Sequence, residues 1–74
     1  MYTYYVIKLY LVNGDWGYAC YGGMSKDINS SMFFDTYDEA RNWYEKNDRY
    51  ALYGGIRVDH SNSKIVSVSS RNPI

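Results

Sequence analysis

The chain has one cysteine, one histidine and one proline among its 74 residues, and its charges cancel. The lone cysteine, Cys20, excludes an intramolecular disulfide, and no secretory leader precedes the first strand-like segment, so we expect a reducing, cytoplasmic setting. Eight basic and eight acidic residues argue against both a basic nucleic-acid binder and an acidic mimic of nucleic acid. No apolar run approaches the roughly 20 residues of a membrane-spanning helix, so we expect no membrane partner.

The same scarcity limits the chemistry that the chain can perform. A structural zinc site takes four ligands, and Cys20 with His60 would supply only two unless a second subunit contributes the others. We expect the cysteine to be buried under a helix and the histidine to lie in a turn, which separates them as a nucleophile pair. The carboxylates of Asp35, Asp38 and Glu39 precede or open the expected helix, where the helix dipole explains them better than acid–base catalysis. The sequence therefore predicts no enzyme, no metal site and no cofactor.

One segment, Thr36–Asn47, has a clear helical period. Thr36 followed three residues later by Glu39 fits a capping box, in which the threonine hydroxyl accepts from the backbone N–H of the glutamate. One face repeats at the helical spacing and consists of Tyr37, Ala40, Trp43 and Tyr44. A helix of about three turns is not stable alone in water, so this segment predicts a sheet beneath it.

The N-terminal part of the chain predicts a hairpin. Residues Tyr2–Val12 are rich in β-branched and aromatic side chains, and Asn13-Gly14 is a strong signal for a two-residue turn. With that turn, the facing pairs are Leu11–Trp16, Leu9–Tyr18 and Ile7–Cys20, which gathers most apolar side chains on one face. A longer loop through Asp15 would shift this register.

The rest of the chain completes an α+β domain. After Gly22-Gly23 ends the hairpin, the expected elements are a polar loop at Met24–Ser31, a short strand or packed bend at Met32–Phe34, the helix, a strand at Ala51–Asp59 bent at Gly54-Gly55, a turn at His60–Lys64, and a final strand at Ile65–Ser69. The last two strands would pair with Val58 opposite Val66 and Ile56 opposite Val68. We expect residues 1–74 to form one domain with an antiparallel sheet of about four strands, the first central, and one helix packed on one face, in the order ββ(β)αββ.

The face of the first hairpin away from the helix is the candidate binding surface. If the helix covers Ile7 and Leu9, the opposite face has no cover from this chain; the predicted contact residues there are Tyr2, Tyr4, Lys8, Tyr10 and Tyr21. Tyrosine is enriched in protein interfaces. Three alternative roles stay open for this face: ordinary strand tyrosines, a homodimer surface that adds stability to a small core, and a stacking platform for single-stranded nucleic acid, for which basic residues are few.

Three stretches together carry a resemblance: Y-Y-V-I-K at Tyr4–Lys8, G-G-M-S-K-D-I at Gly22–Ile28, and F-D-T-Y-D-E-A at Phe34–Ala40. They resemble small proteins encoded by phages and prophages of low-GC Gram-positive bacteria, over about the first two thirds of the chain; the C-terminal hairpin departs from the pattern. The resemblance implies action in a bacterial host cell by binding a host protein, as anti-defence inhibitors such as anti-CRISPR proteins do. It carries over no functional residues.

Overall fold

Strand β1 (Tyr2–Tyr10) is the centre of the molecule in the computed structural model, which describes residues 1–73. The other elements are β2 (Trp16–Cys20), β3 (Gly23–Ser25), the 3-10 turn η1 (Ile28–Ser30), α1 (Tyr37–Trp43) with its wider π-helical continuation η2 (Tyr44–Asp48), β4 (Leu52–Tyr53), β5 (Ile56–Arg57) and β6 (Lys64–Ser70). The main antiparallel sheet has the order β3-β2-β1-β6, and β4 and β5 form a separate ribbon. The expected α+β class and the central first strand are confirmed.

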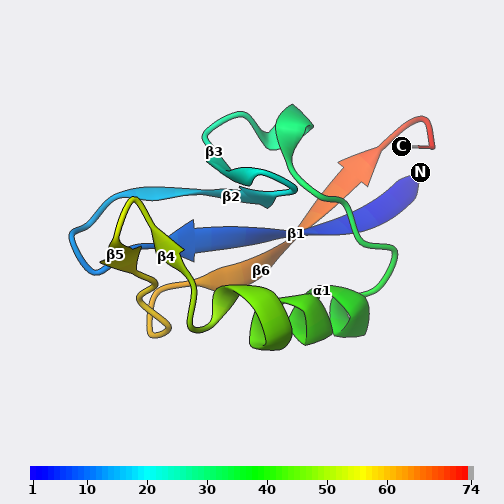
Figure 1. Ribbon diagram of the computed structural model, residues 1–74. Coiled ribbons are helices and arrows are strands. Elements are labelled where there is room, and N and C mark those ends of the chain that lie inside the picture. The colour runs from blue at the N-terminus through cyan, green and yellow to red at the C-terminus, as the bar shows by residue number, and fades with distance from the viewer. Residues whose placement is uncertain (74) are drawn as a thin grey trace.

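The helix begins where the sequence predicts. The Thr36 hydroxyl accepts a hydrogen bond from the backbone N–H of Glu39 at 3.2 Å, which satisfies one of the free donors of the first turn. At the other end, the Arg49 guanidinium pairs with the Glu45 carboxylate at 2.7 Å. Figure 1 shows α1 running along β6 and β1, with η1 on the opposite side of β1.

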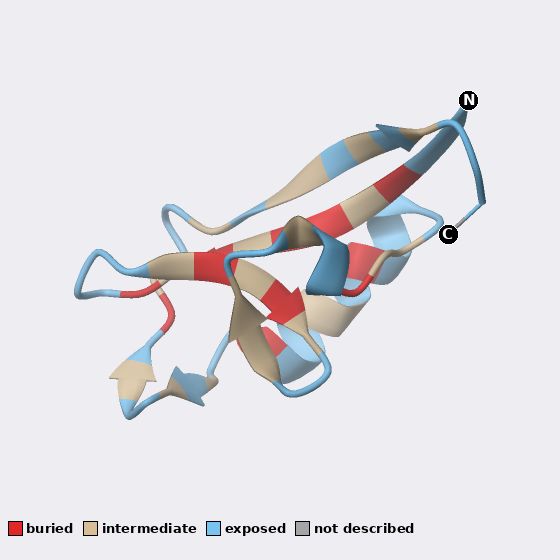
Figure 2. Cartoon of the chain, turned by 90° about the horizontal axis from the view of Figure 1, so that it is seen from above, coloured by how far each residue is buried: buried red, intermediate tan, exposed pale blue. Residues whose placement is uncertain are grey.

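The core lies between the helix and the sheet. Its buried members are Ile7, Leu9, Leu11, Ala19, Met32, Ala40 and Val58. Ala40 has no exposed surface and lets the helix approach the strands closely, while Trp43 and Tyr44 pack against the edge of the cluster. Figure 2 shows the buried positions concentrated along β1 and the elements facing it. The prediction that the helix covers the face of Ile7 and Leu9 is therefore confirmed.

The predicted register of the first hairpin is wrong by one residue. Tyr10 pairs with Trp16 and Lys8 with Tyr18, because the loop contains three residues rather than two and Leu11 N–H donates to Asp15 O at 2.8 Å. A two-residue turn of this kind needs positive φ at both central positions. Gly14 has it, with φ of 92°, but Asn13 does not, and no residue other than glycine has positive φ in the described part of the chain.

The shift reverses the two faces of β2. Gly17 and Ala19 are buried on the helix side, and Trp16 and Tyr18 lie on the opposite face with Lys8 and Tyr10. Gly17 is required here, since a Cβ on it would lie 3.0 Å from the Cβ of Met24. Cys20, expected under the helix, is partly buried and does not belong to the core cluster of the described residues.

The C-terminal strands also differ from the prediction. Gly54 and Gly55, both with positive φ, form a turn between β4 and β5 rather than a bend within one strand. β6 pairs with β1 instead of with residues 51–59, so Val66 lies opposite Val6 and Val68 opposite Tyr4. Val58 bridges Leu11. β1 carries large apolar side chains on both faces, so a strand that pairs along its edge can bury apolar side chains of its own against them.

The sheet opens between β1 and β2, and residues 32–34 enter the gap. Met32 N–H donates to Ala19 O at 3.0 Å, and Phe34 and Tyr5 exchange two backbone hydrogen bonds of 2.8 and 2.9 Å. The Phe33 ring therefore meets the Tyr4 ring edge-on, with centroids 6.2 Å apart. The segment predicted to be a polar loop, Met24–Ser31, contains the last two residues of β3 and the whole of η1.

Candidate functional site

The predicted contact residues separate into three groups. Tyr4 is only 9% exposed and packs against Phe33, so most of its ring is unavailable to a partner. Tyr2 is 47% exposed near the start of β1, and Tyr21 is 88% exposed in the turn after β2. Lys8 and Tyr10 remain, partly buried and two residues apart on β1. The patch as predicted is therefore not one continuous surface.

The corrected register builds a different surface around the last pair. We call it the Trp16 face, and it consists of Lys8, Tyr10, Trp16, Tyr18 and Lys26. The ammonium nitrogens of Lys8 and Lys26 lie 4.7 and 4.5 Å from the centre of the Trp16 ring. Tyr18 contacts the same indole edge-on at a centroid distance of 5.7 Å, and Lys8 also lies 5.5 Å from the Tyr10 ring. Cations at these distances are attracted to the electron-rich ring faces and hold the cluster together.

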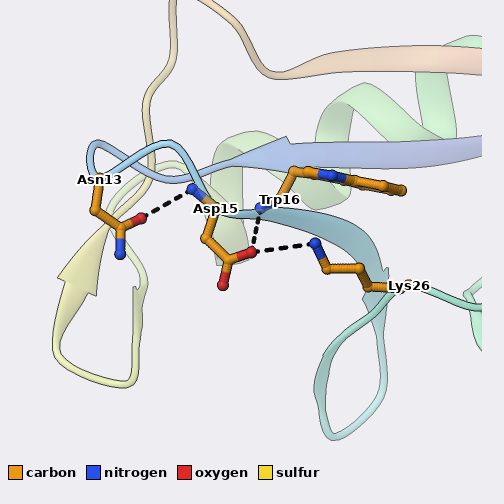
Figure 3. Close-up of polar contacts among 4 residues, drawn as sticks. All are labelled: Asn13, Asp15, Trp16 and Lys26. Carbon is orange, nitrogen blue, oxygen red and sulfur yellow. Dashed lines mark hydrogen bonds and ion pairs between the residues drawn. The ribbon is translucent and has the colours of Figure 1, made fainter.

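The loop before β2 fixes the position of Lys26. The Asn13 side-chain oxygen accepts from the Asp15 N–H at 3.0 Å, and the Asp15 carboxylate accepts from the Trp16 N–H at 2.9 Å (Figure 3). The same carboxylate oxygen lies 3.3 Å from the Lys26 ammonium. The hydrogen bond from the Trp16 N–H has the largest effect on the pKa of Asp15, and Lys26 has the second largest. Both hold that pKa below its ordinary value. The carboxylate therefore stays ionised and places one lysine over the tryptophan.

Positive charge is concentrated on and beside this face despite the net charge of zero. Lys8 lies directly opposite Lys64 on β6, and Lys26 approaches from the β3 side. Like charges at facing positions of a sheet are destabilising, so Lys8 and Lys64 repel each other. Asp15 is the only acidic group paired with these three lysines within residues 1–73. An anionic partner would offset the repulsion.

The shape of the face suits a broad contact. The hollow beside Trp16, lined by Asp15, Met24, Ser25 and Lys26 as well, has a volume of about 170 Å³. Pockets for small molecules are usually larger, about 300–1,000 Å³. A macromolecular surface is therefore a better match for the Trp16 face than a small substrate.

Among the described residues, no three His, Cys, Asp or Glu side chains gather closely enough to hold a metal ion. Within the same part of the chain, no helix has the length and apolar character to cross a bilayer. His60 lies in a turn, as predicted, with its Nδ1 2.9 Å from the Tyr44 hydroxyl.

Sequence reasoning missed three members of the Trp16 face, namely Trp16, Tyr18 and Lys26, and one signal could have found the first two. Trp16 and Tyr18 face the same side as Lys8 only if the first loop has three residues. Asp15, directly after Asn13-Gly14, is the residue that closes such a loop. Lys26 carries no periodic signal, since its position depends on the short strand β3.

No family model, curated protein or solved structure matches the chain. Its function must therefore be inferred from its own residues.

Proposed function

We propose that this protein is a non-enzymatic inhibitor that binds an acidic surface of a host protein through the Trp16 face and blocks that surface. The concentration of lysine around partly exposed aromatic rings supports the proposal. Three lysines lie on or next to one sheet face, and within residues 1–73 only Lys26 has a carboxylate partner, Asp15. Two of the lysines, Lys8 and Lys26, contact the same indole. Aromatic side chains supply buried area in such contacts, and the cations select a negatively charged partner.

The resemblance of three stretches to small phage and prophage proteins supplies the setting of the proposal. Proteins of that kind act inside a bacterial cell, and anti-defence inhibitors such as anti-CRISPR proteins act by occupying a surface of a host component. The proposed partner is therefore a host defence or regulatory protein. Inhibition would follow from covering its surface, with no reaction at the interface.

The test is a capture experiment with charge-reversed variants. Tagged wild-type protein, a Lys8→Glu/Lys26→Glu double variant and a Lys46→Glu control are each incubated with lysate of a Gram-positive host, and bound proteins are identified by mass spectrometry. Lys46 is exposed on η2, so its reversal matches the chemistry at a site outside the Trp16 face.

We expect one host protein in stoichiometric amount with the wild type and with Lys46→Glu, and its loss with the double variant. The affinity of the purified pair should fall by on the order of tenfold or more when both lysines are reversed. Equal capture by all three proteins would refute the assignment of the Trp16 face. The partner would then bind another surface.

Single-stranded nucleic acid is the second candidate partner, and the alternation of rings and lysines on a sheet face favours it. Trp43 packs against Phe34 in the core, so a Trp43→Phe variant leaves Trp16 as the fluorescent reporter. Nucleic-acid binding should quench that fluorescence and weaken steeply as salt is added. No quenching by oligothymidine or oligouridine at low salt would remove this candidate.

Self-association through the same surface is the weakest of the three possibilities. Two Trp16 faces in contact would bring the lysines of both copies together, and like charges across an interface oppose association. The expectation of a homodimer stays a prediction, and light scattering at high protein concentration tests it.

A further inference from the structure

A second surface of the molecule is hollowed, and none of its residues belongs to the Trp16 face. It is a groove of about 490 Å³, open to solvent, between the segment after the helix and the turn before β6. The residues that line it include Tyr50, Leu52, Arg57, His60, Ser61 and Val12. This volume is within the usual range for a ligand site.

The rim of the groove exposes large apolar side chains. Tyr50 is 81% exposed, Leu52 60% and Val12 55%, and all three line the same groove. Apolar side chains scattered singly over a surface are ordinary, but a gathering of them around a hollow is typical of a contact site. The groove can therefore receive a large apolar group.

The charges of the groove are mainly positive. Arg49 and Arg57 line it, and within residues 1–73 Arg57 forms no ion pair. The one carboxylate, Asp59, accepts from the Ser61 N–H at 3.0 Å and from the Asn62 side-chain amide at 2.6 Å, so its oxygens are occupied by the turn. Arg57 is therefore the cation available to an anionic group that enters.

The walls of the groove are held in position before anything binds. The Tyr50 ring lies 5.5 Å from the Arg49 guanidinium carbon and 6.0 Å from the His60 ring centre. His60 is fixed in turn by its contact with the Tyr44 hydroxyl at 2.9 Å. A preformed wall reduces the entropy that binding would otherwise cost, so an exposed tyrosine at this position can contribute affinity.

From this geometry we propose that the groove binds an acidic peptide segment of a partner protein, with one large apolar side chain inserted beside Tyr50 and Leu52 and a flanking carboxylate paired to Arg57. The two contacts require each other: the apolar rim alone does not select an anion, and one exposed arginine alone contributes little affinity. This site is independent of the Trp16 face, so a single molecule can hold two partners or two parts of one partner.

The experiment uses labelled peptides and the full chain. The probe is a fluorescein-labelled peptide with one tryptophan flanked by glutamates; a second peptide replaces the glutamates with glutamines, and a third replaces the tryptophan with alanine. Binding is measured by fluorescence anisotropy to the wild type, Arg57→Glu and Tyr50→Ala. The matched controls are Arg71→Glu and Tyr21→Ala, which alter exposed residues outside the groove.

We expect saturable binding of the acidic tryptophan peptide and affinities lower by on the order of tenfold for each of the other two peptides. Arg57→Glu and Tyr50→Ala should each weaken the first peptide by a similar factor, and Arg71→Glu and Tyr21→Ala should leave it unchanged. Arg57 and Tyr50 are both exposed, so we expect their variants to fold. Circular dichroism spectra identical to that of the wild type would establish this.

Three results would overturn the proposal. The first is no saturable binding of the acidic peptide, and the second is equal binding of the glutamine peptide. The third is a concentration-dependent dimer that Arg57→Glu abolishes, which would make a second copy of this chain the occupant. Because the Lys8→Glu/Lys26→Glu variant retains the groove, its peptide affinity separates failure at this site from failure of the Trp16 face.

Discussion

Asp48, at the π-helical end of the helix, is a buried carboxylate that forms no ion pair within residues 1–73. It is 4% exposed; one oxygen accepts from the Tyr53 hydroxyl at 2.5 Å, and the other has no hydrogen-bond partner within the described residues. Burial raises the pKa of Asp48 above the ordinary 3.8, and the hydrogen bond from Tyr53 opposes the rise. Burial also raises the pKa of Tyr53, so its hydroxyl stays a donor. Replacement of Asp48 by asparagine removes this ionisation.

The direction of the pH effect follows from the raised pKa. The folded state binds the proton of Asp48 more tightly than the unfolded state does, so this group contributes stability fully below pH 3.8. That contribution is lost as the pH rises through the folded pKa. An unpaired buried polar group costs about 1–3 kcal/mol, and a charged group costs at least that much. The wild type should therefore lose stability of this order, relative to Asp48→Asn, between acidic and neutral pH.

The assay is urea denaturation of both proteins, followed by tryptophan fluorescence, over a pH series from acidic to neutral. The quantity that matters is the difference in free energy of unfolding between Asp48→Asn and the wild type. Other carboxylates affect both proteins alike and cancel in that difference. We expect the difference to change in favour of Asp48→Asn as the pH rises and then to become constant.

A second variant sharpens the experiment. Tyr53→Phe removes the hydrogen bond that lowers the pKa of Asp48, so the loss of stability should extend to higher pH than in the wild type. A free-energy difference between Asp48→Asn and the wild type that is independent of pH would refute the reasoning. A difference that moves in favour of the wild type would show that the fold stabilises the ionised carboxylate.

Four further substitutions test the packing and the surface. Gly17→Val should destabilise the fold by about 1–3 kcal/mol through overpacking against Met24, whereas Gly22→Ala, with no atom within 4 Å of the added carbon, should alter urea stability little. Leu9→Ala should cost about 2–5 kcal/mol, since the side chain is fully buried, and should leave the protein largely unfolded on warming in a calorimeter. Lys26→Ala should leave the melting temperature nearly unchanged, because its pair with a carboxylate is exposed, but should weaken host-protein binding in a calorimetric titration.

The helix and the face that it covers could be predicted because local chemistry determines both. The hydroxyl of Thr36 caps the first turn whatever lies beneath it, and the spacing of Ala40 and Trp43 orients one apolar side. Capping and periodicity act over a few residues, so the sequence displays them directly.

The register of the first hairpin could not be decided in the same way. Both loop lengths bring Leu9 to the core, and they differ only in whether Asn13 adopts positive φ. The deciding interactions are distant: Gly17 must face the helix side to make room for Met24, which requires β3 to be in place. A slip of one residue transfers every side chain of β2 to the other face, so Trp16 and Tyr18 lie on the side of Lys8 rather than on the side of Leu9.

The pairing of β6 with β1 has a consequence for how the protein folds during its synthesis. Tyr2 pairs with Ser70 and Lys8 with Lys64, so the central strand obtains its second neighbour from a segment more than 50 residues later in the sequence. Contacts this distant form slowly, because a long loop must close before they contribute any stability. During synthesis on the ribosome, the edge of β1 that pairs with β6 stays without a partner strand until residues 64–70 emerge. A chain interrupted before that point presents an open apolar strand, which chaperones and proteases recognise, so partial products should be removed rather than bind a partner.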